Sequence, residues 1–183
     1  MKQTIFVIGL LVLISSSAFC QDEVPIFNSY HKNIYAEFLG SHILGGINYD
    51  MRLKKGKMDG IGFRAGVGGL RASAFAENTS VSIGIVTFPL EFNHLVGKNR
   101  SSFVSGIGLL PVYAAVNADG EITNNEFIQE EGFGLVGGFM TFGYRYQPRK
   151  TGLMFQVNWN PLMIRKSGFT MGWFGLGLGI GFK

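Results

Sequence analysis

Residues 174–182 read FGLGLGIGF, a stretch in which large apolar residues alternate strictly with glycine. A period of two is typical of a β-strand, because successive side chains of a strand point to opposite faces. One face carries Phe174, Leu176, Leu178, Ile180 and Phe182, and the other face is bare. Glycine loops that bind dinucleotides lie in a turn before a helix, so this spacing does not indicate a dinucleotide site. The segment predicts a strand with one bulky apolar face.

The same period recurs upstream, with a second face that is polar as well as small. It is clear at residues 43–53, 61–68, 138–147 and 153–160, and less regular at residues 33–41, 81–96 and 102–117. Together with the last strand, these segments predict eight strands. Pro89 and Pro111 each remove a backbone donor, so a bulge or a break is expected at both positions.

The interior of an eight-stranded barrel is only wide enough to be filled by side chains, so the bulky face must point outward. Such a belt exceeds the few hundred Å² of contiguous apolar surface that soluble monomers expose, and lipid is its natural solvent. A closed barrel also satisfies every backbone group inside a membrane. The sequence therefore predicts an all-β fold, an eight-stranded antiparallel up-and-down transmembrane β-barrel at residues 33–183. Two alternatives stay open: a periplasmic lipocalin-like barrel that binds an apolar ligand in its interior, and a narrow pore.

The first residues have the composition of a secretory signal peptide, with Lys2, an apolar run at residues 5–14 and small residues before Cys20. The run is too short to span a membrane as a helix. Cleavage after Cys20 removes residues 1–20 and leaves residues 21–32 as a mobile lead-in. A lipidated Cys20 is the alternative, although Phe19 is unusual directly before a lipidated cysteine. The expected location is the outer membrane of a Gram-negative bacterium.

The connections between the predicted strands differ in length and in charge. Those at residues 54–59, 97–101 and 148–152 are short, as periplasmic turns of such barrels are, whereas residues 72–80 and 117–131 form longer connections. Basic residues gather at the short turns and acidic residues at the long connections, a pattern that solvated loops also explain. The basic set is Lys54, Lys55, Lys57, Lys98, Arg100, Arg149 and Lys150, and the acidic set is Glu77, Asp119, Glu121, Glu126, Glu130 and Glu131.

Charged residues also occur on the inward face of the predicted strands. Three are acidic and three are basic: Glu37, Asp50, Glu91, Arg52, Arg64 and Arg145. Their equal numbers favour a structural ion-pair network that fills the lumen, because unpaired buried charges are costly. A gate or a polar ligand site is the alternative interpretation.

No motif indicates catalysis, a metal or a cofactor. The histidines His31, His42 and His94 lack metal-ligand spacing, and Cys20 is the only cysteine. Ser41 and His42 could approach a carboxylate such as Glu77, but no spacing supports a catalytic triad. A formal net charge of +4 is too small to imply a nucleic-acid partner.

Four short stretches resemble the small outer-membrane β-barrel proteins common in Bacteroidetes: IYAEFLG at 34–40, INYD at 47–50, GYRYQP at 143–148 and WFGL at 173–176. The resemblance covers nearly all of the expected mature chain and implies the fold and the location, but no established activity. Proteins of this group usually end on an aromatic residue that resembles an assembly signal. Here Lys183 follows Phe182, which is a small departure from that pattern.

The longest predicted connection, at residues 117–131, is the candidate binding surface, since loops on a rigid scaffold are common binding sites. It combines acidic and apolar residues, of which Asp119, Glu121, Ile122, Phe127 and Ile128 are the candidates for contact. The apolar members could equally pack on the barrel rim. The expected partners are membrane lipid and a surface or envelope protein, and the sequence does not indicate the oligomeric state.

Overall fold

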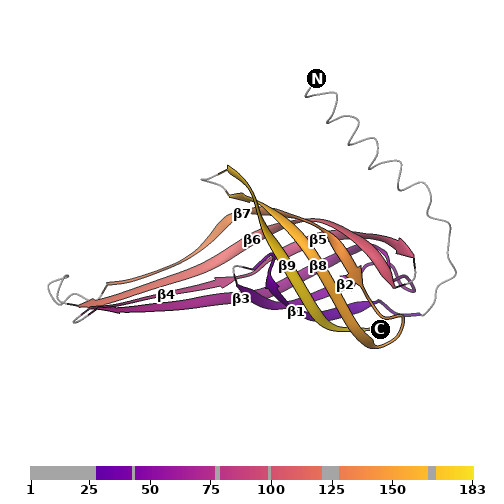
Figure 1. Ribbon diagram of the computed structural model, residues 1–183, viewed down its shortest axis with the longest axis horizontal. Coiled ribbons are helices and arrows are strands. Elements are labelled where there is room, and N and C mark those ends of the chain that lie inside the picture. Colours follow the sequence, from indigo (N-terminus) through magenta and orange to yellow (C-terminus); the bar gives the residue numbers. More distant parts are fainter. Residues whose placement is uncertain (1–27, 43, 77–78, 99, 121–127, 165–167) are drawn as a thin grey trace, which may run out of the picture.

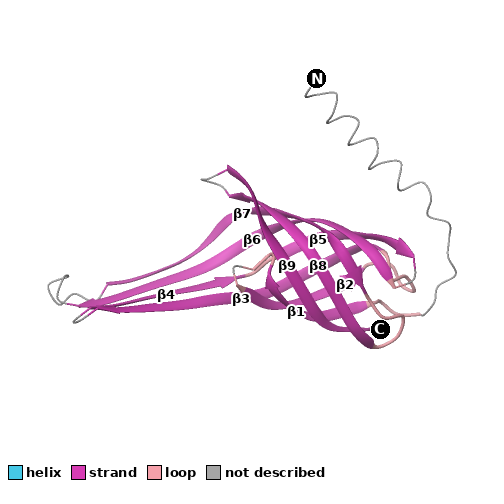
Figure 2. Cartoon of the chain, in the orientation of Figure 1, coloured by secondary structure: helices cyan, strands magenta, loops and turns pink. Residues whose placement is uncertain are grey.

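The computed structural model describes residues 28–42, 44–76, 79–98, 100–120, 128–164 and 168–183 (Figure 1). The predicted signal peptide and residues 21–27 of the predicted lead-in lie outside these ranges. The strands are β1 (Lys32–Leu39), β2 (Gly45–Arg52), β3 (Gly60–Ala76), β4 (Thr79–Thr87), β5 (Leu90–Lys98), β6 (Ser101–Gly120), β7 (Ile128–Tyr146), β8 (Gly152–Ile164) and β9 (Gly168–Phe182). Figure 2 shows strands joined by turns and loops throughout the described part. No helix among the described residues is long and apolar enough to span a membrane.

Antiparallel pairing closes these strands into a barrel. Consecutive strands pair with one another except β4 and β5, and β9 pairs back onto β1. β4 and β5 lie end to end, because both pair with β3 on one side and with β6 on the other. They form a single member of the ring, so the predicted eight-stranded antiparallel barrel is confirmed.

Both prolines that were expected to interrupt the strands do so. β4 ends at Thr87 and β5 begins at Leu90, with Pro89 in the break. The Phe88 N–H donates to the carbonyl oxygen of Pro111, and the Gly66 N–H donates to that of Pro89, both at 2.9 Å, so the break keeps two hydrogen bonds. The register of β6 against β7 shifts between Leu110 and Pro111.

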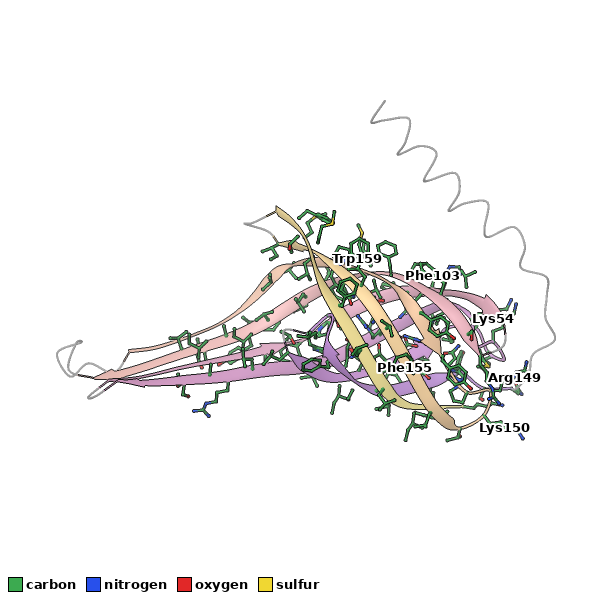
Figure 3. All side chains as sticks on the ribbon, in the orientation of Figure 1. Lys54, Phe103, Arg149, Lys150, Phe155 and Trp159 are labelled. Atoms are coloured by element: carbon green, nitrogen blue, oxygen red, sulfur yellow. The ribbon has the colours of Figure 1, made fainter. Side chains whose placement is uncertain are left out.

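The alternating faces lie as the sequence predicts, with apolar side chains outward and polar side chains inward. In β1, Ile34 and Phe38 are 46% and 60% exposed, whereas Asn33 and Glu37 are buried. Figure 3 shows Phe103, Phe155 and Trp159 on the outside of the barrel. The belt thus surrounds a polar interior, which is the reverse of the lipocalin-like arrangement considered from the sequence.

Glycines on the inward face make room for the large polar side chains. A Cβ atom added to Gly62 would lie 2.1 Å from Arg52 Cζ, and one added to Gly106 would lie 2.2 Å from Glu91 Oε1. On β9, a Cβ atom at Gly179 would lie 2.4 Å from Tyr35 Cβ. The high glycine content of the chain therefore follows, in part, from the need to fit large side chains such as Arg52, Glu91 and Tyr35 into a narrow barrel.

Four strands continue beyond the barrel as an open sheet. β2 pairs with β3 only as far as Gly68, and β8 pairs with β7 only from Gly137. Past these points β3, β4, β6 and β7 pair only with one another, and Figure 1 shows them extending to the left of the barrel. We call this extension, at residues 69–76, 79–87, 112–120 and 128–136, the blade.

The blade corrects the prediction of two long loops. Strand structure covers residues 72–76 and 79–80 of the first expected connection, and residues 117–120 and 128–131 of the second. The two expected connections lack an apolar alternation, and where their side chains are described, at Ala72, Ser73 and Glu131, they are exposed. Without a buried face no alternation is required there, so the strands continue by backbone pairing.

Candidate functional site

The polar lumen brings together the six charged residues that the sequence analysis selected. β1, β2, β3, β5 and β7 position them, and each side chain points inward because it shares the parity of its strand's polar face. Their exposed fractions do not exceed 2% for any of Glu37, Asp50, Arg52, Arg64, Glu91 and Arg145. Three carboxylates face three guanidinium groups, so this set carries no net formal charge.

Asp50 holds two arginines at the end of the lumen near the short turns. Arg52 Nη2 donates to Asp50 Oδ1 at 2.7 Å. Arg145 donates to the same carboxylate through both terminal nitrogens, at 2.8 Å and 3.2 Å. Asn93 Nδ2 adds a hydrogen bond of 2.8 Å to Oδ2. Hydrogen bonds to both oxygens compensate for the burial of this carboxylate.

Arg64 lies between the other two carboxylates, deeper in the barrel. It forms an ion pair with Glu91 through Nη2, and its Nη1 lies 3.5 Å from Glu37 Oε2. The same Nη1 donates to the Tyr35 hydroxyl at 3.2 Å. Thr141 donates to Glu91 Oε2 at 3.0 Å. The two clusters together link strands on opposite sides of the ring.

Ser41 and His42 point into the lumen but do not form a catalytic pair. Ser41 Oγ donates to Glu37 Oε2 at 2.8 Å. His42 instead contacts Thr87 Oγ1 at 3.2 Å and Asn48 Oδ1 at 3.3 Å. Glu77, the carboxylate considered with them, lies outside the described residues. The Ser41 hydroxyl is therefore engaged by Glu37, and Ser41 and His42 do not make the hydrogen bond that activation of a serine nucleophile requires.

Several amide side chains complete the network and were not selected from the sequence. Gln156 accepts a hydrogen bond from Arg145 Nε and donates to Asn158 Oδ1, and Asn158 donates to Glu37 Oε1 at 3.0 Å. Asn160 Nδ2 donates to Thr141 Oγ1 at 2.8 Å. These amides share the polar parity of β8, so the alternation of that strand already places them on the inward face.

An apolar cluster closes the lumen on the side of the blade. Leu110, Val112, Phe139 and Leu162 are each at most 9% exposed and pack together, with Ile85 and Ile164 against them. The Phe139 ring also lies 5.6 Å from the Arg64 guanidinium carbon. The interior is thus filled by ion pairs and amides at one level and by apolar side chains at the next.

The rim at the short turns is basic, as the sequence predicts. Figure 3 shows Lys54, Arg149 and Lys150 at this end of the barrel. His31 is fully buried there, and its Nε2 lies 3.1 Å from the carbonyl oxygen of Pro148. Burial lowers the pKa of His31 below its ordinary value, although the contact with Pro148 opposes this shift.

The residues chosen as a candidate surface loop divide into two groups. Asp119 lies in β6 opposite Ser80, and Ile128 lies in β7 opposite Ala118, so both belong to the blade. Glu121, Ile122 and Phe127 lie outside the described residues. Elsewhere on this end, Tyr113 donates to Glu131 across the β6–β7 pair at 2.5 Å.

The described residues thus define a closed eight-stranded β-barrel with a self-paired polar interior, and no group of three or more of them is placed to hold a metal ion through His, Cys, Asp or Glu. Neither a protein-family model nor a curated protein matches the chain. Solved structures with a similar fold include Ail of Yersinia pestis, with a TM-score of 0.47 and 10% identity over 84% of this chain and 97% of that one.

Two further structures resemble the chain to a similar degree. The N-terminal β-barrel domain of Pseudomonas aeruginosa OprF has a TM-score of 0.46 and 10% identity, over 85% of this chain and 98% of that one. Acinetobacter baumannii CarO has a TM-score of 0.41 and 11% identity, over 87% and 97%. Because these values are low, the assignment of a closed barrel rests on the strand pairings of this chain.

Proposed function

We propose that this chain is an integral outer-membrane protein, secreted through a cleaved signal peptide, that acts in surface interaction and has no catalytic role. The observation that supports this most directly is the belt of exposed apolar side chains around a closed barrel. Leu153, Phe174 and Ile107 are 70%, 68% and 63% exposed, which a water-soluble barrel would not tolerate over its whole circumference. Contact with lipid removes the free-energy cost of exposing these apolar side chains to water.

The backbone and the lumen also suit a membrane. Every strand of the ring pairs with a neighbour on both sides, with short gaps such as that between Phe139 and Phe142 on β7, so few backbone groups would face hydrocarbon without a partner. The charged side chains lie inside, where they neutralise one another instead of meeting lipid. A narrow pore is the weaker candidate, because the same side chains and the apolar cluster occupy the space that a solute would need.

The orientation that we propose places the short basic turns in the periplasm and the blade outside the cell. Short turns are periplasmic in barrels of this kind, and longer segments are extracellular. This places the largest exposed part of the chain where a partner can reach it. The resemblance to small Bacteroidetes barrels agrees with this placement but adds no ligand.

The blade has two unpaired edges, which is the basis for a role in interaction. Within the described part of the chain, residues 69–76 of β3 and 128–136 of β7 have a neighbouring strand on one side only. An edge strand presents free backbone donors and acceptors to which another extended chain can add. On the β7 edge, Phe133 and Leu135 are 70% and 48% exposed and could give such pairing side-chain selectivity. We propose that a protein partner pairs with this edge.

Two measurements test the proposal. Cells expressing the chain should release it with the outer-membrane fraction, and the protein should migrate differently on gels before and after boiling. Protease added to intact cells should cut at the blade and spare the short turns. A soluble periplasmic product would contradict the membrane assignment.

A charged edge strand tests the role of the blade. Lysine side chains on an edge prevent strand addition, so Phe133→Lys with Leu135→Lys should abolish partner capture from the cell surface while the gel shift on boiling persists. Ala72→Lys with Ser73→Lys on the opposite edge, where both residues are exposed, is the matched control. Equal capture by all three proteins would show that the β7 edge is not the binding surface.

A further inference from the structure

A groove of about 470 Å³ crosses the outside of the barrel at the level where the strands are interrupted. Two rows of outward side chains border it, and each row follows paired positions from strand to strand. The first row is Phe63, Phe92, Ile107 and Met140, which are successive register partners across β3, β5, β6 and β7. Phe63 and Phe92 pack edge to face with ring centroids 5.6 Å apart.

The second row lies one step nearer to the blade. It runs through Leu90, Leu109, Gly138, Met163 and Phe169, again as successive register partners, from β5 to β9. Gly138 stands in the middle of this row and contributes no side chain. The centre of the groove is therefore open to the barrel wall, while both ends are lined by large apolar groups.

Irregularities of the wall explain why the groove lies here. The β6–β7 register shifts at Pro111, and the β8–β9 register shifts between Asn160 and Leu162, on either side of Pro161. Proline removes a ladder hydrogen bond, and a bulge bends its strand. Paired positions of β7 and β8 are also absent between Phe139 and Phe142. Pro161 itself lines the groove.

We propose that this groove binds one acyl chain of a membrane lipid. The inference rests on the proposed insertion of the barrel in a membrane, because the groove is a recessed part of the same outward belt. Among its described lining residues only Glu91 is charged, and the Glu91 carboxylate lies in the lumen with Arg64 and Thr141. The site therefore offers van der Waals contact and no partner for a polar group.

The groove has room for part of a single hydrocarbon chain. The two rows flank each other over β5, β6 and β7, which is roughly 10 Å with neighbouring strands about 4.8 Å apart, and the second row continues alone to β9. One leaflet of a hydrocarbon core about 30 Å thick accommodates acyl chains that extend roughly 15 Å. A chain between the two rows would contact protein on three sides, whereas chains elsewhere on the belt contact it on one.

Photolabelling tests the proposal with the mature protein in vesicles of phosphatidylethanolamine and phosphatidylglycerol. A small fraction of the phosphatidylethanolamine carries a diazirine on one acyl chain, and labelled peptides are mapped by mass spectrometry. We expect labels to concentrate severalfold at Met140 and Met163 relative to Leu153 and Ile61, which are exposed on the outward face and do not line the groove. Labels spread evenly over the belt would overturn the proposal.

Two variants fill the groove from different rows. Gly138→Leu places a side chain at the open centre, where the added Cβ atom would lie 3.2 Å from the Gly108 carbonyl oxygen, and Met140→Trp narrows the groove without using that glycine. Both variants should lose the concentration of label in the groove. They should also lose the bound lipid that we expect native mass spectrometry to detect on the extracted wild type. Gly132→Leu, with no atom within 4 Å of its added Cβ, is the matched control and should keep both.

The outcomes separate this inference from the proposed function. If all variants show the gel shift on boiling but Gly138→Leu and Met140→Trp retain label and lipid, the groove does not bind an acyl chain, and the membrane assignment stands. If the wild type shows neither the gel shift nor any label, both proposals fail. A crosslinked dimer in which Met140 and Met163 are shielded from lipid would assign the groove to a second copy of the chain and overturn the inference.

Discussion

Replacing Asp50 by leucine removes the carboxylate that neutralises two arginines at once. Arg52 Nη2 and Arg145 Nη1 lie 2.7 Å and 2.8 Å from Asp50 Oδ1, and all three side chains are fully buried. The remaining lumen carboxylates are engaged with Arg64. The variant would therefore keep two neighbouring positive charges in the barrel with no carboxylate in contact.

The expected loss in the free energy of unfolding depends on how many buried charges each variant leaves without an oppositely charged partner. Removing one member of a buried ion pair costs about 3–5 kcal/mol, because the other charge stays desolvated. For Asp50→Leu we expect about 5 kcal/mol, since two charges are left. For Arg145→Leu we expect about 3 kcal/mol, because Asp50 keeps its bonds to Arg52 and Asn93. The double variant should cost less than the sum, since it leaves only Arg52 without a carboxylate.

Urea unfolding in vesicles, followed by tryptophan fluorescence and by mobility on unboiled gels, measures these differences in the free energy of unfolding. Arg71→Leu is the matched control: it removes the same side chain from an exposed position of β3 and should change the free energy of unfolding little. The reasoning is refuted if Asp50→Leu is no less stable than Arg145→Leu, or if the two effects add in the double variant.

Three further predictions concern other parts of the barrel. Because burial lowers the pKa of His31, the unfolded chain binds a proton that the folded chain does not, and the free energy of unfolding should fall as the pH drops below about 6.5. The variant His31→Gln should weaken that dependence in unfolding curves at pH 7.5 and 5.5, roughly one unit to either side. Phe139→Ala should cost about 3–5 kcal/mol by the same assay, and a cost below about 1 kcal/mol would argue against the apolar cluster as a packed closure of the lumen. Wild-type protein in planar bilayers should give no steady conductance, and a reproducible open level would show that the lumen is not closed.

The parts of the fold that could be predicted from the sequence are those with one apolar and one polar face. Alternation at residues 153–160 and 174–182 predicts which side chains face outward and which face the lumen, and the structure agrees at these positions. Pro89 and Pro111 likewise identify two of the interruptions of the strands, whereas the β8–β9 shift at Pro161 was not predicted. The alternation follows from the different surroundings of the two faces, and the interruptions follow from the backbone donor that proline lacks, so both can be recognised in the sequence.

The pairing of charges inside the lumen could not be predicted in the same way. Asp50 and Arg64 are direct register partners on β2 and β3, which makes them the obvious ion pair. Asp50 instead bonds Arg52 on its own strand and Arg145 across the lumen. Arg64 does pair with a register partner, Glu91 on β5, but its second carboxylate is that of Glu37 on β1. Partners across a barrel depend on its stagger, which follows from all the registers together and not from any one pair of strands.

The blade shows that the surroundings of a strand determine whether it can be recognised from its sequence. Residues 112–120 and 128–135 continue the same β6–β7 ladder that, nearer the short turns, alternates apolar and polar side chains. The surroundings change along this ladder: nearer the short turns one side forms the belt and the other lines the lumen, whereas residues 131–136 of β7 are exposed on both sides. Exposed residues of the blade pack neither in the belt nor in the lumen, so their identity can suit contact with the proposed partner. The segment that looked like a loop is therefore the part of the barrel whose sequence is most available for function.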